Sequence, residues 1–243
     1  MIGGQATRTC TSLAPPRARI RFSSDALQKA YDEAKTPSDR VMLAFEGIMS
    51  HMPQANRHLI ATKAATKHGG TLSQRLIELV RIRMAYWTQC RTCMTIRFEE
   101  SLDDGLDQNA VCSLEQPQST GHLSDKEKAA IAFADQFAND WLSIDNATFD
   151  GLRELFSEAE IVQLGLVCGL HLGTGRLMAA FAVTEDLPEA MQGESGVGKF
   201  KPWEVDIDAL VLPPLPDEED ASSAVSGWND QDKAGRKKAV GAA

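Results

Sequence analysis

The chain has 243 residues, of which 43% are hydrophobic and 24% are charged, a composition typical of a folded protein rather than a disordered one. A formal net charge of -9 and a pI of about 5.1 argue against a nucleic-acid-binding role. Apart from one close pair, the five cysteines are scattered, which does not match the disulfide framework of a small secreted domain. We therefore expect a protein of a reducing compartment, the cytoplasm.

Composition divides the chain into three parts. Residues 1–23 contain four arginines, no acidic residue and no apolar stretch of the kind that a secretory signal needs, so we expect a flexible tail. Residues 24–187 carry helical patterns and are interpreted as one domain. Residues 188–243 are rich in glycine, proline and acidic residues and are interpreted as an arm followed by a tail. No window reaches the apolar length that a membrane-spanning helix needs, which predicts a soluble protein.

The first half of the domain predicts four helices. Their expected starts are Ser24, Pro37, Gln54 and Thr71. The first helix ends near Ala34, and Gly69–Gly70 ends the third, because glycine readily adopts the conformation that terminates helices. The second helix has an apolar face, formed by Val41, Met42, Phe45, Ile48 and Met49. The fourth helix carries a strongly apolar run that leads to a pair of cysteines.

In the second half, a helix that contains the cysteine pair is expected to reach about Leu102, and residues 103–122 are expected to form a polar loop. Two Ser-x-x-Glu capping boxes then mark helix starts at Ser124 and Ser157. The first of these helices has an apolar stripe, formed by Ala129, Phe133, Phe137 and Trp141. The second, over residues 161–183, is the most apolar, and its regularly spaced glycines predict a smooth face for close packing of another helix: Gly165, Gly169 and Gly173.

The C-terminal part offers two further features. The short apolar run from Val205 to Leu212 is expected to dock on the helical core or on a neighbouring subunit, and residues 217–243 are expected to be mobile. Residues 193–199 match Gly-x4-Gly-Lys, the beginning of a phosphate-binding loop. Phe200 stands where that motif needs a serine or threonine for magnesium, so we interpret the segment as a flexible hinge.

The most informative segment is Cys90-x-x-Cys93, which follows the apolar run that contains Glu78. Two cysteines at this spacing can close a disulfide or share a metal, and a helix N-terminus would stabilise their thiolates. A carboxylate among apolar side chains can hold or relay a proton near neutral pH. A zinc site would need Cys112 and His122 as further ligands at a loose spacing. We favour a redox dithiol, without metal or cofactor, over zinc and over two packing cysteines.

Glu78, followed after eleven residues by Cys90-x-x-Cys93 on paired helices, resembles the alkyl hydroperoxidase D (AhpD)-like branch of the carboxymuconolactone decarboxylase superfamily. The resemblance covers roughly residues 37–183. It implies an all-α helical bundle that assembles into homo-oligomers, trimers or hexamers. It also implies that Cys93 attacks a peroxide, that Cys90 resolves the oxidised product, and that Glu78 belongs to the proton relay.

Two positions bear on this relay. The resemblance implies a histidine four residues after the second cysteine, where this chain has Arg97. Arginine stays charged at neutral pH and cannot shuttle a proton, but it can stabilise a thiolate or hold a peroxide oxygen. His171 is interpreted either as a hydrogen-bonded core histidine or, if it lies near Cys93, as a replacement for the missing relay histidine. Glu78 has an alternative role in an ion pair with Arg81 or Arg75, each three residues away on its helix.

The sequence therefore predicts a thiol-dependent oxidoreductase that reduces a small-molecule hydroperoxide or a disulfide and is regenerated by an external thiol reductant. Two alternatives stay open. One is a lyase or decarboxylase that acts on a small carboxylated lactone or ring, with Arg97 or Arg176 holding the substrate carboxylate. The other is a non-catalytic helical oligomer whose cysteines form a structural or redox-sensing pair.

Overall fold

The computed structural model describes residues 18–184, 187–192 and 199–215. Over these ranges the regular secondary structure is helical apart from one pair of very short strands, which confirms the expected all-α class. The glycine-rich motif at 193–198 and the C-terminal tail from residue 216 lie outside the described residues, as do residues 1–17.

The described elements follow in chain order. The α-helices are α1 (Asp25–Glu33), α2 (Pro37–Met49), α3 (Pro53–His68), α4 (Gln74–Thr88), α5 (Arg91–Thr95), α6 (Glu99–Asp103), α7 (Gln108–Cys112), α8 (Asp125–Asn139), α9 (Asn146–Arg153) and α10 (Glu158–Phe181). The strands are β1 (Arg97–Phe98) and β2 (Val211–Leu212). Short 3-10 helices are η1 (Ser113–Glu115), η2 (Pro117–Ser119), η3 (Trp141–Ser143), η4 (Glu189–Met191) and η5 (Pro202–Glu204).

Most predicted helix starts are confirmed at the level of the capping hydrogen bonds. Ser24 and Thr36 accept backbone N–H groups of the first turns of α1 and α2. Ser124 and Ser157 form complete capping boxes at α8 and α10. The expected start of the fourth helix at Thr71 is wrong, because Ser73 caps α4 by accepting the N–H of Leu76 at 3.1 Å.

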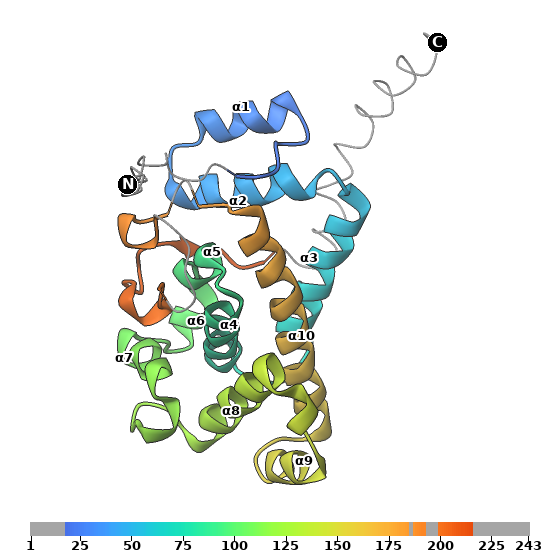
Figure 1. The fold of residues 1–243 in the computed structure, drawn as a ribbon, viewed down its shortest axis with the longest axis vertical. Helices are drawn as coiled ribbons and strands as arrows, with labels where there is room; N and C mark the ends of the chain where they lie inside the picture. Colours follow the sequence, from blue (N-terminus) through green and yellow to red (C-terminus); the bar gives the residue numbers. More distant parts are fainter. Residues whose placement is uncertain (1–17, 185–186, 193–198, 216–243) are drawn as a thin grey trace, which may run out of the picture.

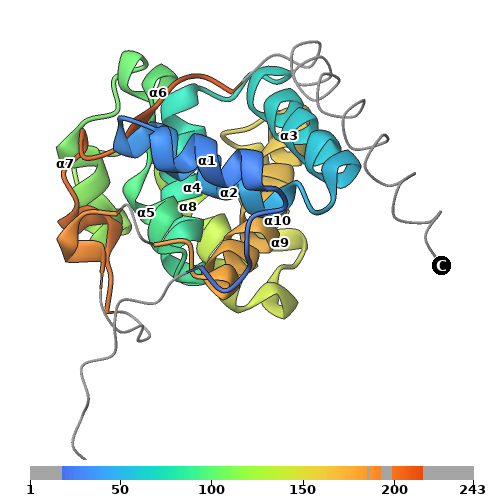
Figure 2. The ribbon, with the colours of Figure 1, turned by 90° about the horizontal axis from the view of Figure 1, so that it is seen from above.

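Helices α4 and α10 lie side by side through the middle of the molecule (Figure 1). Helices α1 and α2 lie across one end of this pair, α8 and α9 lie at the other end, and α3 runs along α10 (Figures 1 and 2). Eleven of the fifteen residues of α4 are buried, which makes it the central helix of the core. The cysteine pair follows directly after this helix, so the core holds its position.

The chain after the cysteine pair does not form the expected helix to Leu102. Helix α5 ends at Thr95, and β1 follows, paired in parallel with β2 from the C-terminal arm. The N–H of Arg97 donates to the carbonyl of Leu210 at 2.9 Å, so it bonds to the arm rather than within a helix. The expectation that the Val205–Leu212 run docks on the core is confirmed.

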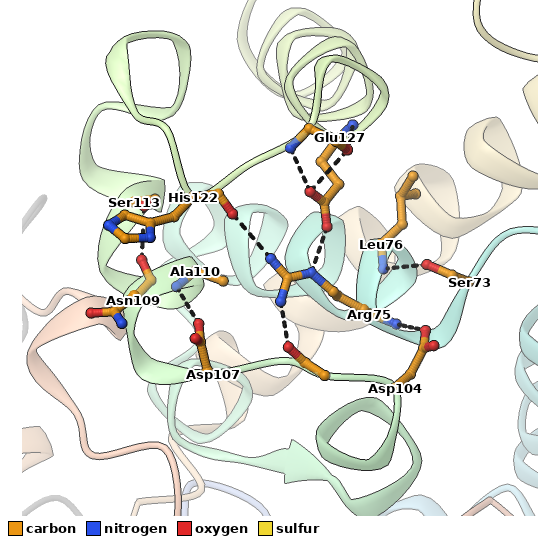
Figure 3. Close-up of polar contacts among 12 residues, drawn as sticks. Ser73, Arg75, Leu76, Asp104, Asp107, Asn109, Ala110, Ser113, His122 and Glu127 are labelled. Carbon is orange, nitrogen blue, oxygen red and sulfur yellow. Dashed lines mark hydrogen bonds and ion pairs between the residues drawn. The ribbon is translucent and has the colours of Figure 1, made fainter.

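Residues 103–122 are not the polar loop that we expected. They contain α7, η1 and η2, and three of their apolar side chains are fully buried, those of Ala110, Val111 and Leu114. Asp107 caps α7 by accepting the N–H of Ala110 at 2.8 Å, and Ser113 donates to the carbonyl of Asn109 (Figure 3). Local capping thus stabilises helical turns in a segment whose polar residues suggested a loop.

Arg75 joins the start of α4 to the start of α8 and to the segment between them (Figure 3). Its Nε donates to Glu127 at 2.7 Å, its Nη1 to the carbonyl of Gly105, and its Nη2 to the carbonyl of His122 at 3.1 Å. Its backbone N–H donates to Asp104 at 2.8 Å. All of these partners lie away from Glu78, so Arg75 is not its ion-pair partner.

Three of the expected helix faces need correction. Trp141 lies beyond the end of α8 and is 66% exposed, and Met42 on α2 is 41% exposed. The face with Gly165, Gly169 and Gly173 contacts no described helix, since a Cβ at any of the three would meet nothing within 4 Å. Gly175 is instead the close approach, because a Cβ there would lie 2.5 Å from the hydroxyl oxygen of Thr88 on α4.

By length and composition alone, helix α10 is long and apolar enough to cross a membrane. We expected no window of that apolar length from the sequence. One face of it packs in the main apolar cluster, through Ile161, Leu164 and Val167. Gln163 accepts the N–H of Leu72 at 3.1 Å and donates to the carbonyl of Thr66 at 2.8 Å. These contacts are those of a core helix.

Candidate redox site

Cys90 and Cys93 form a disulfide at the junction of α4 and α5. Gln89 adopts a left-handed conformation (φ 53°) that ends α4 and turns the chain into α5. Cys90 is the N-cap of α5, and its Sγ lies 3.2 Å from the N–H of Cys93. The pair therefore occupies a helix N-terminus, where backbone N–H groups stabilise a sulfur that carries negative charge.

The two sulfurs lie in different surroundings. Cys90 is 1% exposed, whereas Cys93 is half-buried and lines a cavity of about 410 Å³. The walls of this cavity come from α2, α3, α4, α5, α10 and the C-terminal arm, which contributes Leu212 and Leu215. A molecule in the cavity would therefore meet Cys93 first.

Glu78 lies in the wall of the same cavity and forms a buried ion pair with Arg81. The pair is bidentate: Arg81 Nε donates to one carboxylate oxygen at 2.7 Å and Nη2 donates to the other at 2.6 Å. The side chain of Glu78 is 1% exposed and that of Arg81 is 3% exposed. The ion pair at helical spacing is thus present, and it coexists with a position of Glu78 beside the cysteine cavity.

Arg81 also joins the ion pair to the cysteine segment. It donates to the backbone carbonyls of Cys93 and Ile96, both at 2.6 Å. The guanidinium lies in the cavity wall and places a permanent positive charge near the cysteine pair. The sequence suggests Arg81 only as a partner for Glu78. Its link to the cysteine segment depends on how α5 folds back along α4.

Arg97 is fully buried and is not among the residues that line the cavity. Its guanidinium donates to the carbonyls of Met94, Ile96 and Pro202 at 2.7, 2.8 and 3.1 Å. Burial, then the charge of Arg81, lowers its pKa to about 10, so it stays protonated at neutral pH. Arg97 therefore lies behind the cavity that Cys93 and Glu78 line, close enough for the charge of Glu78 to act on it. Its side chain fastens the C-terminal arm to the cysteine segment.

His171 on α10 lines the cavity together with Cys93 and Glu78, although the three are far apart in sequence. Its ring is half-buried, and no hydrogen bond to it is present within the described ranges. Burial, followed by the charges of Lys63, Arg81 and Lys67, lowers its pKa well below 6.5. The imidazole is therefore neutral at physiological pH, with one nitrogen able to donate and the other to accept.

Lys63 and Lys67 are cavity residues that the sequence analysis missed. They lie on one face of α3 at i, i+4 spacing, and Ile60 of the same face also lines the cavity. Two lysines that interrupt an apolar helical face are a signal that could have identified them. Burial, then the charge of Arg81, lowers the pKa of Lys63 to about 8.

The remaining described cysteines lie outside the site. Cys168 is buried in the core, and burial raises its pKa to about 12, so it is protonated and unreactive. Cys112 is exposed at the end of α7, near the carbonyl of Trp203. Over the described ranges, no three His, Cys, Asp or Glu side chains are grouped to hold a metal.

Solved structures share this fold at low sequence identity. The alkylhydroperoxidase AhpD core, an uncharacterized peroxidase-related protein from Ralstonia eutropha, matches with a TM-score of 0.55 and 15% identity over 72% of this chain and 100% of that chain. A protein of unknown function from Agrobacterium tumefaciens, described as a candidate antioxidant defence protein AhpD, matches with a TM-score of 0.50 and 20% identity. That match covers 56% of this chain and 93% of the other.

No protein-family model matches the chain, and no curated protein matches it at a significant level. The structural matches show that the chain has an AhpD-like fold, which confirms the fold implied by the Glu78 and Cys90-x-x-Cys93 pattern. At identities of 15% and 20%, the likeness is one of fold alone.

Proposed function

We propose that this protein is a thiol-dependent oxidoreductase that reduces a hydroperoxide through Cys93 and Cys90. The observation that carries the proposal is the position of Cys93, the half-buried sulfur of the disulfide, in a cavity that Glu78 and His171 also line. The names of the solved structures with this fold, antioxidant defence and peroxidase-related, are in accord with that chemistry.

The proposed reaction begins with the reduced protein. The Cys93 thiolate attacks the terminal oxygen of the hydroperoxide, an S–O bond forms as the O–O bond breaks, and the alkoxide takes up a proton to leave as an alcohol. The Cys90 thiolate then attacks the sulfenic acid, and the disulfide forms as hydroxide leaves and is protonated to water. An external dithiol reduces the disulfide by exchange. A disulfide substrate would be reduced through the same attack by the Cys93 thiolate.

Each neighbouring side chain has a role in this proposal. Glu78 accepts the thiol proton of Cys93, and the charge of Arg81 stabilises the resulting thiolate. His171 passes to the leaving alkoxide the proton that Glu78 took from Cys93, because a neutral imidazole can accept a proton on one nitrogen as it donates from the other. It so takes the place of the relay histidine that the chain lacks at Arg97. Arg97 is a positioning residue, because it bonds the backbone carbonyls of the segment that carries Cys93.

Three points weigh against the alternatives. A small carboxylated lactone is polar over most of its surface, whereas the cavity is lined mostly by aliphatic and aromatic side chains and could pair only its carboxylate, at Lys63. Neither Arg97 nor Arg176 lines that cavity, so neither is placed to hold a substrate carboxylate there. A purely structural disulfide needs no neutral histidine and ion pair around an open cavity.

The test is peroxide consumption by the reduced protein, followed with thiol titration and intact mass. The wild type should consume one equivalent of hydroperoxide per chain and lose two thiols and two hydrogens. Cys93→Ser should abolish this reaction, whereas Cys90→Ser should react once and stop at a sulfenic acid or mixed disulfide. Cys112→Ser serves as the matched control, because that thiol is exposed and outside the cavity.

The same variants separate the alternatives. A decarboxylase would keep its activity in Cys90→Ser, and a structural pair would show itself as lost stability in both single variants without peroxide consumption in the wild type. A wild type that consumes no peroxide or disulfide and closes no disulfide would overturn the proposal.

We also propose that the protein is a cytoplasmic homo-oligomer, a trimer or hexamer. Support comes from the outer face of α10, where Val162, Leu166 and Leu177 are 61%, 48% and 36% exposed. The glycines of this helix leave that face smooth and open. Light scattering of the wild type and of Leu166→Lys tests this, and a monomeric wild type would contradict it.

A further inference from the structure

The cavity beside Cys93 carries one positive charge that nothing in its described walls neutralises. Lys63 Nζ has no carboxylate within 4 Å among the described residues, and its recorded contact is with the face of Phe45, 5.6 Å from the ring centroid. Burial lowers the pKa of this ammonium group, with the charge of Arg81 as the second cause. A cation in such a place is under-solvated and would gain from an anionic partner.

The other charged groups of the wall already have partners. Arg81 and Glu78 neutralise each other, and Lys67 pairs with Glu100 and lies 4.1 Å from the centroid of the Phe98 ring. Glu46 accepts hydrogen bonds from Ser50 and Asn56 at 2.6 and 2.9 Å and lies beyond ion-pair distance from Lys63. The cavity thus presents the charge of Lys63 to whatever enters.

The rest of the cavity favours an apolar molecule. Its volume of about 410 Å³ is in the range of sites that enclose drug-sized ligands. Its surface is formed mainly by aliphatic and aromatic side chains, such as Ile60, Ile77, Leu170 and Leu212. An apolar wall with one cation favours an amphipathic anion over an uncharged apolar molecule or a small polar acid.

We propose that the cavity binds an apolar chain that ends in a carboxylate, with the carboxylate at Lys63 and the chain along the apolar wall. This carboxylate site, together with the proposed function on which it rests, identifies the substrate class as a hydroperoxide of a medium-chain carboxylic acid. The carboxylate fixes one end of the molecule, so that a hydroperoxide group elsewhere on the chain reaches Cys93 in the same cavity. The reaction balances as above, with the carboxylate unchanged.

Binding is tested on the oxidised full-length chain, in which the disulfide prevents turnover. Isothermal titration should show that decanoate binds one per chain and at least tenfold more tightly than 1-decanol. Lys63→Met should reduce this preference at least tenfold, and Lys63→Arg should retain it, because arginine restores the charge. The matched control is Lys126→Met, an identical change at a lysine that lies outside the cavity and pairs with Glu160.

Two further arms sharpen the binding test. Glu46→Gln should bind decanoate as tightly as the wild type or more tightly, since it removes a negative charge from the wall.

Decanoate affinity should also fall as the pH rises from 7 to 9, because the pKa of Lys63 is about 8 and deprotonation removes its charge. The groups that share the cavity with Lys63 are Arg81, Lys67, Glu46, Glu78 and His171, the last of which is neutral over this range. Equal affinities for decanoate and 1-decanol, or an unchanged preference in a folded Lys63→Met, would overturn the proposal.

A kinetic comparison separates this inference from the proposed function. The reduced protein should show a lower KM for 10-hydroperoxydecanoic acid than for decyl hydroperoxide, and Lys63→Met should reduce this ratio at least tenfold. If both hydroperoxides are reduced equally well and independently of Lys63, the anion site is wrong and the oxidoreductase stands. If decanoate binds through Lys63 and neither hydroperoxide reacts, the oxidoreductase is wrong and the carboxylate site stands.

Discussion

Helix α4 carries two buried arginines, two residues apart, which form ion pairs on different sides of the helix. Arg81 forms a bidentate ion pair with Glu78 on the cavity side. Arg83 forms one with Asp135 of α8 on the other side, at 2.6 and 3.0 Å, and donates to the carbonyl of Leu114 at 2.7 Å. The local chemistry of the two pairs is nearly the same.

The surroundings of the pairs differ. Arg81 and Glu78 are 3% and 1% exposed and contact the cysteine segment and the cavity. Arg83 and Asp135 are 10% and 28% exposed, and their neighbours are the rings of Tyr86 and Trp87. The first pair is almost fully buried and lies beside the cysteine segment, whereas the second is more exposed and joins two helices. Two arginine–carboxylate pairs of nearly the same local geometry thus differ in their burial and in what lies beside them.

The largest expected difference is in stability. Glu78→Gln leaves the Arg81 charge buried without its counter-ion, and we expect a loss of about 3–5 kcal/mol in the free energy of unfolding. Asp135→Asn leaves Arg83 closer to water, and we expect a loss of about 1–2 kcal/mol. Urea unfolding at pH 7 measures both. Equal losses would show that the difference in burial does not control the energies of the two pairs.

A second difference is that the Arg81–Glu78 pair lines the same cavity as the neutral imidazole of His171, whereas the Arg83–Asp135 pair does not line it. His171→Asn should reduce hydroperoxide turnover on the order of 100-fold, the typical contribution of a general acid. Oxidation of the dithiol by diamide, which needs no proton for an alkoxide, should keep its rate. A similar loss in both reactions would contradict the proton-donor role, and His122→Asn, at an exposed position, is the control.

Exchange of each arginine for lysine tests the contribution of geometry. Arg81→Lys keeps the charge but cannot hold Glu78 and two backbone carbonyls together, so turnover should fall on the order of 10-fold. Arg83→Lys should change turnover by less than about twofold, because its partners do not touch the cysteine segment. The pH profile of Cys93 alkylation by iodoacetamide should shift only in Arg81→Lys. A shift in both variants would mean that the two regions are coupled.

The smallest expected effect is a pH dependence of stability. The pKa of His171 lies well below 6.5 in the folded protein and near 6.5 when unfolded, so the unfolded state binds the proton first as the pH falls. Stability should therefore decrease below pH 6.5, by up to about 1.4 kcal/mol per pH unit. His171→Asn should flatten this slope, whereas Asp135→Asn should keep it. Thermal unfolding between pH 5 and 7 measures the slopes.

The sequence predicted the local parts of the structure well. The caps at Ser24, Ser124 and Ser157 form the expected hydrogen bonds, because a cap depends only on residues within one helical turn. The cysteine pair and its preceding carboxylate were found for the same reason. The predicted helix through Leu102 was wrong because the competing partner, β2, lies more than a hundred residues away.

By itself, the sequence determined an all-α fold, its capped helices, and a dithiol that follows a buried carboxylate. Only the tertiary structure decided that Arg81 rather than Arg97 adjoins the cavity, and that Lys63 and His171, on two other helices, line the same cavity as Cys93. The physical reason is that capping and periodicity act within a few residues, whereas a cavity is formed by the packing of α3, α4, α5 and α10 against one another. The direction of each side chain follows from that packing.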